Sequence, residues 1–371
     1  MMETIRSLTI AEWTAWVVVV ALNAYVLFAG ADFGGGVWDL FASGPRRQRQ
    51  RDLIAHAIGP IWEANHVWLI VVVVVLFVCF PPAFAAFGTV LHIPLSLMLI
   101  GIVLRGSAFV FRAYSYGPRS EQRQWGRVFA VSSLVTPIVL GMCVGAVASG
   151  RVGNVLASVG HGPAAVLPSA LDTPPPGSIA ASFTSLYVSP WLSPFTFAVG
   201  AMTLALFSFL AATYLTIDAE GDAELQDDFR RRALAAAVAS MGTAAIALVL
   251  GAARGGVMGR LVGVGWSLPL LIVSGVAGLA AVVSLLRRRY QLARIAAGAW
   301  VTLIIWGWVM AQFPLIIPPS LTIGEASAPP GVLKDTLAVL AVGGVILAPS
   351  LWYLIRVFKT GERAEIVPPP R

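Results

Sequence analysis

The sequence predicts an all-α, multi-pass membrane protein, and three observations carry that prediction: its composition, its long apolar stretches and the spacing of its arginines. Hydrophobic residues make up 58% of the 371 residues and charged residues only 12%, whereas roughly 25% of residues are charged in soluble domains. A chain with so few charges cannot cover a water-facing surface. We therefore expect most of it to lie in the lipid bilayer.

The apolar residues fall into about nine stretches of the length that one membrane-spanning helix needs. A helix crosses the hydrocarbon layer with about 20 mostly apolar residues. Little sequence remains for a domain outside the membrane. We expect the spans at 13–37, 58–80, 83–106, 127–150, 194–217, 233–253, 263–286, 296–318 and 335–357.

The basic residues indicate how these helices are oriented. Arginine clusters follow the first, third, fifth, seventh and ninth stretches, beginning near Arg46, Arg112, Arg230, Arg287 and Arg356. Connections rich in Lys and Arg stay on the cytoplasmic side, so we expect the N-terminus outside and the C-terminus in the cytoplasm. The net charge of +7 therefore reports membrane topology and does not indicate a nucleic-acid partner.

A long proline-rich connection divides the chain. It contains PPPG at 174–177 and, because proline opposes regular helix, should be a surface loop. Four spans precede it and four follow in the same orientation, which predicts two four-helix bundles and one peripheral helix. The expected units are a first bundle (1–151), an extracytoplasmic loop (152–193), a second bundle (194–318), and a ninth helix with a cytoplasmic tail (319–371).

Few charged side chains lie inside the apolar stretches, and those few are expected to meet. Asp32 and Glu63 fall about one or two turns inside the cytoplasmic ends of the first two spans, and Arg105 reaches a similar depth on the third. Two carboxylates facing one guanidinium can leave one acid able to exchange protons. The alternative is a fixed ion network that only holds three helices together. The sequence leaves both open.

The stretch IWEANHVWLI at 61–70 places other polar groups beside Glu63. His66 is three residues after Glu63 and therefore shares its helix face, where it could continue a proton relay. The glycines of GADFGGGV follow Asp32 and would allow another helix to approach closely. The residues expected at helix interfaces are Trp62, Asn65, Trp68, Gly34, Gly35 and Gly36.

Cofactor binding by this chain alone is not expected. His66 and His92 are the candidate haem ligands, but their predicted depths differ by roughly 9 Å at about 1.5 Å per residue. The sequence has no nucleotide-binding, zinc-protease or CxxC motif. We therefore predict no metal, no firmly bound cofactor and no catalytic residue on this chain.

Several blocks together resemble subunit II of the cytochrome bd-type quinol oxidases. They are IGPIWEANHVWLI, GADFGGGVWDL, VLRGSAFVFR, WLSPF, AATYLT and AQFPLIIPP, and they occur in order along most of the chain. Many members have WDGN where this chain has WEAN, so Glu63 replaces an aspartate. The WEAN form is similar to the bd-like branch of the family.

The resemblance implies a subunit of a bacterial cytoplasmic-membrane enzyme that oxidises quinol and reduces oxygen to water. Its partner would be a homologous subunit I that carries the haems: haem b is expected there, and haem d is left open. Subunit II would stabilise that partner and contribute to proton uptake through Asp32, Glu63 and His66, with Arg105 in support. The resemblance also leaves open small single-span subunits and a quinone held structurally. A proton-coupled secondary transporter is the alternative, since buried acids and paired bundles occur there too.

Overall fold

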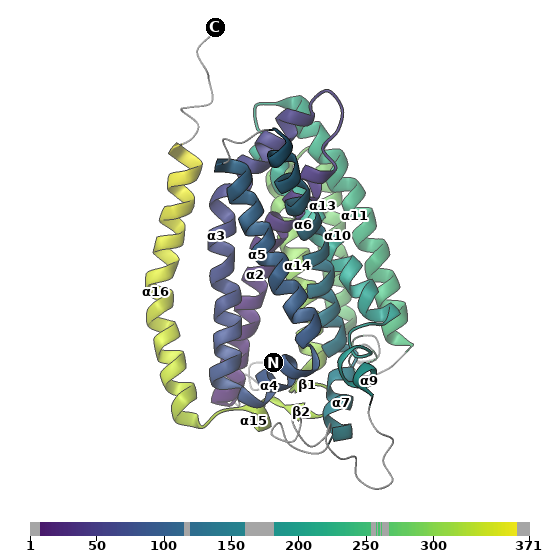
Figure 1. Ribbon diagram of the computed structural model, residues 1–371, viewed down its shortest axis with the longest axis vertical. Coiled ribbons are helices and arrows are strands. Elements are labelled where there is room, and N and C mark those ends of the chain that lie inside the picture. The colour runs from purple at the N-terminus through teal and green to yellow at the C-terminus, as the bar shows by residue number, and fades with distance from the viewer. Residues whose placement is uncertain are drawn as a thin grey trace.

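We describe the chain from a computed structural model (Figure 1). The described residues are 8–114, 119–159, 182–253, 257, 259, 261 and 267–361, and within them the side chains of 60–64, 113–114, 119–123, 159 and 354–361 are outside the description.

The described part is almost entirely helical. Eight of its helices are long and apolar enough to cross a membrane, or nine if the bent pair α3–α4 counts as one span. This confirms the prediction of an all-α, multi-pass protein. The helices are α2 (Ile10–Leu40), α3 (Arg47–Cys79), α4 (Pro81–Val90), α5 (His92–Tyr114), α6 (Arg119–Ala148), α7 (Arg151–Val159), α9 (Phe183–Tyr187), α10 (Pro194–Asp218), α11 (Ala223–Ala252), α13 (Ser267–Leu286), α14 (Tyr290–Gln312), α15 (Ile323–Ala326) and α16 (Pro330–Gly361).

The predicted third span, 83–106, is wrong in its limits. The apolar run is interrupted: α3 bends by 116° into the short helix α4, and α5 begins only at His92. Proline explains both breaks. Pro81 starts a new helix after Phe80, and Pro94 has no N–H to donate to the carbonyl of Val90. The third spanning helix therefore lies about nine residues later than 83.

Helix α10 lies at the centre of the bundle. It packs against α2 and α6 from the first half of the chain and against α11 and α14 from the second. It begins at a capping box in which Ser193 and Thr196 satisfy each other's backbone N–H groups. The two halves therefore meet along α10, whereas α16 stands at the side, next to α3 (Figure 1).

The three consecutive glycines of α2 each face a different helix. A methyl group at Gly34 would overlap the Phe207 carbonyl of α10, and one at Gly36 would overlap Ser133 of α6. At Gly35 it would lie 2.7 Å from Ile58 of α3. Helix α2 can therefore sit in the middle of these neighbours only because this segment has no side chains.

The end of the bundle at which α2 begins is closed by short elements. The strands β1 (Leu315–Ile317) and β2 (Leu321–Thr322) pair antiparallel and lead into α15. Ser320 donates to the Gly153 carbonyl at 2.6 Å, and the Ala328 N–H donates to the Cys79 carbonyl at 2.8 Å. These contacts tie the segment before α16 to α7 and to the end of α3.

Candidate functional site

A fully buried ion pair joins α2 to α5. Arg105 donates to both carboxylate oxygens of Asp32, at 2.6 and 2.8 Å, and to the Asp32 carbonyl at 2.9 Å. Asp32 is 0% exposed and Arg105 is 2% exposed. This two-point geometry is the strongest form of an arginine–carboxylate contact. The two charges therefore stabilise each other in a place where hydrocarbon would solvate either of them poorly.

The rest of the Arg105 guanidinium is also enclosed. Its Nε donates to the Ser133 hydroxyl at 3.0 Å, and that hydroxyl donates to the Phe129 carbonyl at 2.7 Å. The rings of Phe33 and Phe129 each lie 4.8 Å from the guanidinium carbon. Aromatic faces attract a cation, so the arginine is held by α2 and α6 as well as by its carboxylate.

The α3 segment that carries Glu63 is attached to this pair through Asn65. The Asn65 amide donates to Asp32 at 3.3 Å, and Asn65 is 0% exposed. The side-chain carbonyl oxygen of Asn65 has no hydrogen-bond partner among the described residues. The side chains of Trp62 and Glu63 lie outside the described residues, although their backbone is helical. Asn65 therefore fixes the rotation of the turn that bears Glu63.

Two neighbours of Asn65 on the same helix are less enclosed. His66 and Trp68 are both half-buried. The Trp68 indole N–H has no partner among the described residues, and the ring packs against the cluster that contains Phe33 and Phe207. Trp68 thus contributes to the packing of α3 against the site.

A second ion pair lies two helical turns further along α2 and α5, and sequence reasoning missed it. Arg112 donates to both oxygens of Asp39, at 2.9 and 3.0 Å, and Asp39 is 2% exposed. Phe129 lies between the two arginines, 5.9 Å from the Arg112 guanidinium carbon. Both pairs join residues 73 apart. That constant spacing shows that α2 and α5 run in the same direction over this length.

A small cavity opens beside Asp32. Its volume is about 20 Å³, and Gly35, Ile58, Tyr214 and Asp218 are among the residues that line it. One water molecule needs roughly 10–15 Å³ of such space and polar neighbours. Asp218 ends α10 and is exposed. The cavity therefore adjoins both the buried carboxylate and a carboxylate at the end of the bundle.

The end of the bundle at which Asp218 lies contains the connections 41–46, 219–222 and 287–289. We call it the basic end. Its basic and acidic segments bind each other: Arg46 donates to Asp228 at 2.7 and 2.8 Å, and Arg49 pairs with Asp222 and Glu224. Hydrogen bonds to Asp228 raise the pKa of the Arg46 guanidinium above its ordinary value. The acidic segment 219–232 therefore links α11 to α3 and to the turn before it.

The histidines do not form a haem-binding pair. His92 is exposed at the start of α5, where its ring packs on Tyr187, with 5.1 Å between ring centroids. His66 is thirteen residues before the end of α3, about 20 Å along the helix axis. Side chains at such different depths do not fit the two axial positions of one haem.

Comparison with known proteins finds similarity along nearly the whole chain. Residues 10–358 match the family described as cytochrome bd terminal oxidase subunit II. A Bacillus subtilis protein named for a cytochrome bd menaquinol oxidase subunit II is 23% identical over 348 residues, covering 91% of this chain and 92% of that protein. The cytochrome bd-I ubiquinol oxidase subunit 2 of Escherichia coli is 28% identical over 145 residues, covering 38% of this chain and 36% of that protein.

A solved structure shares the fold. The bd oxidase of Geobacillus thermodenitrificans contains a chain that superposes with a TM-score of 0.74 at 20% identity. The superposition covers 95% of this chain and 99% of that chain.

Proposed function

Because this chain belongs to the cytochrome bd terminal oxidase subunit II family, and is thus one subunit of a bacterial membrane-bound quinol oxidase, we propose that it stabilises subunit I and supplies it with protons from the cytoplasm. Family membership rules out the alternative of a proton-coupled transporter. We assign the haems to subunit I, in keeping with the poor fit of His66 and His92 to a haem.

The observation that carries the proton-uptake proposal is the buried contact between Asn65 and Asp32. It attaches the turn bearing Glu63 and His66 to a carboxylate beside a cavity that is large enough for one water molecule. Both carboxylate oxygens of Asp32 accept hydrogen bonds from Arg105. Asp32 can therefore take a proton only when its ion pair with Arg105 breaks. We therefore assign the main carrier role to Glu63, with Asp32 and His66 beside it and Arg105 in support.

The stabilising role rests on the apolar surface that the isolated chain exposes. Leu99, Ile100 and Val103 of α5 are each more than half exposed, as is Phe77 of α3. Neighbouring lipid or a second membrane subunit can cover such residues. We assign part of this surface to subunit I, and a loss of haem-bearing subunit I from membranes that lack this chain would support the assignment.

Substitution of Glu63 by glutamine tests the carrier role. Glutamine keeps the side-chain volume but cannot titrate, so we expect a normally assembled complex that consumes oxygen at least about tenfold more slowly. Glu63→Asp restores a carboxylate and should recover most of the rate. Asp52→Asn is the matched control, since Asp52 is an exposed acid on the same helix.

Two results would count against Glu63 as carrier. Wild-type turnover in a fully assembled Glu63→Gln complex would reduce it to a structural polar group. Failed assembly of Glu63→Gln with normal turnover of Asp52→Asn would instead favour a fixed ion network at this position.

A further inference from the structure

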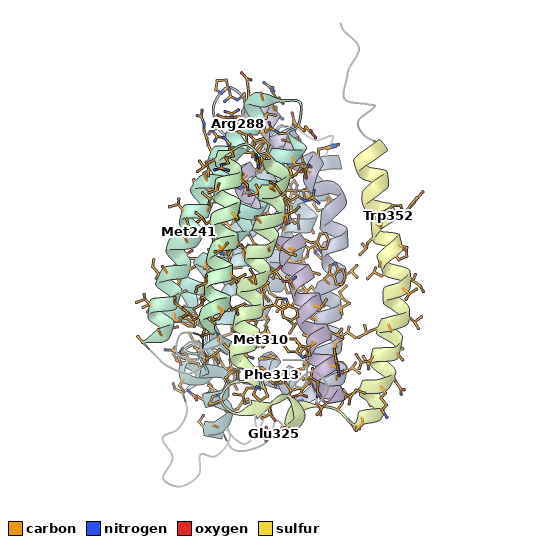
Figure 2. The ribbon with its side chains drawn as sticks, turned by 180° about the vertical axis from the view of Figure 1, so that it is seen from behind. Met241, Arg288, Met310, Phe313, Glu325 and Trp352 are labelled. Carbon is orange, nitrogen blue, oxygen red and sulfur yellow. The ribbon has the colours of Figure 1, made fainter. Side chains whose placement is uncertain are left out.

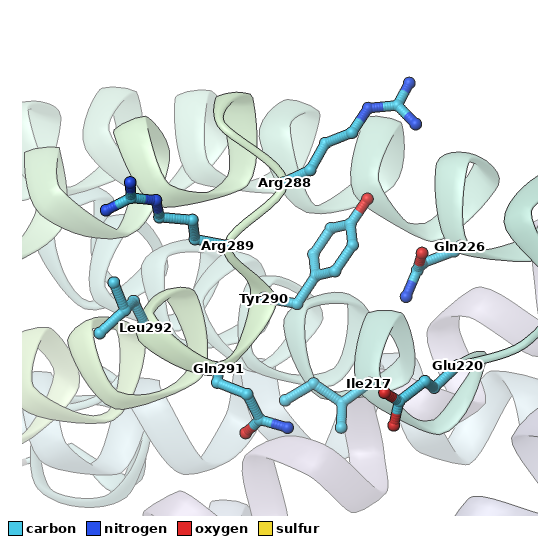
Figure 3. A pocket seen from close by; sticks show the side chains of 8 residues that line it. All are labelled: Ile217, Glu220, Gln226, Arg288, Arg289, Tyr290, Gln291 and Leu292. Atoms are coloured by element: carbon cyan, nitrogen blue, oxygen red, sulfur yellow. The ribbon is translucent and has the colours of Figure 1, made fainter.

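A second, larger cavity lies at the basic end, away from Asp32. Its volume is about 480 Å³, which is within the usual range for small-molecule sites. It is formed by the ends of α10 and α11 and by the turn from α13 into α14 (Figure 3). The lining residues are Ile217, Glu220, Gln226, Arg288, Arg289, Tyr290, Gln291 and Leu292.

Cations outnumber anions at this cavity. Asp227 is shared by Arg230, Arg231 and Arg288, at 3.1, 3.0 and 3.3 Å, so one carboxylate faces three guanidinium groups. The Arg289 guanidinium forms no hydrogen bond or ion pair within the described part of the chain.

Among the lining residues themselves, two arginines, Arg288 and Arg289, stand against one acid, Glu220. Such an excess of fixed positive charge attracts an anion.

Polar groups suited to a phosphate accompany these charges. Figure 3 shows the Tyr290 ring between the side chains of Arg288, Arg289 and Gln226. Arginine is the side chain that best matches phosphate oxygens. The Tyr290 hydroxyl and the Gln291 amide can donate as well.

The cavity continues into apolar surface on the outside of the bundle. Leu292 and Ile295 of α14 are 50% and 68% exposed, and Leu286 of α13 is 56% exposed. Arg288 lies at one extreme end of the bundle (Figure 2). A ligand in this position therefore meets polar groups at its head and hydrocarbon-facing leucines beside it.

We propose that this cavity binds the phosphate headgroup of an anionic phospholipid, with the acyl chains lying along Leu292, Ile295 and Leu286. Basic pockets between helices at the cytoplasmic face suit such headgroups. A soluble phosphate would use the arginines but would leave the adjoining leucines without contact. The proposal is independent of any proton-carrying role of Glu63.

Native mass spectrometry of the delipidated whole oxidase complex tests this proposal, with phosphatidylglycerol, phosphatidylcholine and inorganic phosphate as the three probes. We expect one phosphatidylglycerol bound with preference over phosphatidylcholine, and affinity about fivefold weaker in Arg289→Gln, because one basic residue contributes roughly that factor at a membrane surface. Arg47→Gln is the control: Arg47 is exposed at the same end but does not line the cavity.

Three outcomes would contradict the proposal. If Arg289→Gln and Arg47→Gln weaken phosphatidylglycerol binding equally, the binding depends only on general surface charge, and the proposal is overturned. Equal binding of phosphatidylcholine would overturn the requirement for an anionic headgroup. Full displacement of phosphatidylglycerol by millimolar inorganic phosphate would show a soluble-phosphate site and not a lipid site.

Discussion

At the scale of single residues, the Asp32–Arg105 pair is the feature on which the site depends. Burying two charges costs several kcal/mol each, and their attraction offsets that cost only with good geometry and further hydrogen bonds. Arg105 has both, since Ser133 and the Asp32 carbonyl accept two further N–H groups of its guanidinium. Removing one partner would leave the other charge buried and alone.

We therefore predict that Asp32→Asn destabilises the assembled complex by about 3–5 kcal/mol or prevents its assembly. Asp32→Leu combined with Arg105→Met removes both charges and should restore much of that stability, because no unpaired ion remains. Thermal unfolding of the purified complex measures both variants. An Asp32→Asn complex as stable as wild type would show that the pair is not needed for structure.

The sequence could predict the first ion pair but not the second. Asp32 and Arg105 stand out because each is surrounded by apolar residues, whereas Asp39 and Arg112 lie beside polar connections and look like ordinary helix ends. The 73-residue spacing shared by both pairs was present in the sequence. It becomes informative only once α2 and α5 are known to run in the same direction, close enough for their side chains to pair, which is a tertiary fact.

At the scale of helices, the glycines of α2 determine how closely the bundle can pack. Gly34 faces the Phe207 carbonyl of α10, and backbone cannot rotate away as a side chain can. Sequence reasoning indicated close approach of some helix but could not name three separate neighbours. It also placed the third span too early, because apolar composition does not reveal the break that Pro94 imposes.

We predict that Gly34→Ala lowers the stability of the complex by about 1–3 kcal/mol, since an added methyl group forces α2 and α10 apart. Gly275→Ala is the matched control: Gly275 is inside helix α13 with nothing within 4 Å of an added methyl group. That change should be neutral or slightly stabilising. Assembly yield and thermal unfolding measure both, and equal behaviour of the two variants would contradict close packing at Gly34.

At the scale of the whole molecule, the two ends of the bundle differ in chemistry. The basic end is held by ion pairs between connections far apart in sequence, such as Arg46 with Asp228. The other end is closed by short elements around α15, where Glu325 lies (Figure 2). The arginine clusters are what predict that the basic end faces the cytoplasm, and helix packing alone does not decide that orientation.

Cysteine labelling in intact cells tests that orientation. Arg231 is 76% exposed at the basic end, and Thr184 is exposed on α9 at the opposite end. The native Cys79 and Cys143 are buried, at 0% and 7% exposure, so they should give little background. A membrane-impermeant maleimide should label Thr184→Cys in intact cells but label Arg231→Cys only after the membrane is opened. The reverse pattern would invert the predicted topology, and it would also place the cavity beside Asp32 and Asp218 on the wrong side of the membrane for proton uptake from the cytoplasm.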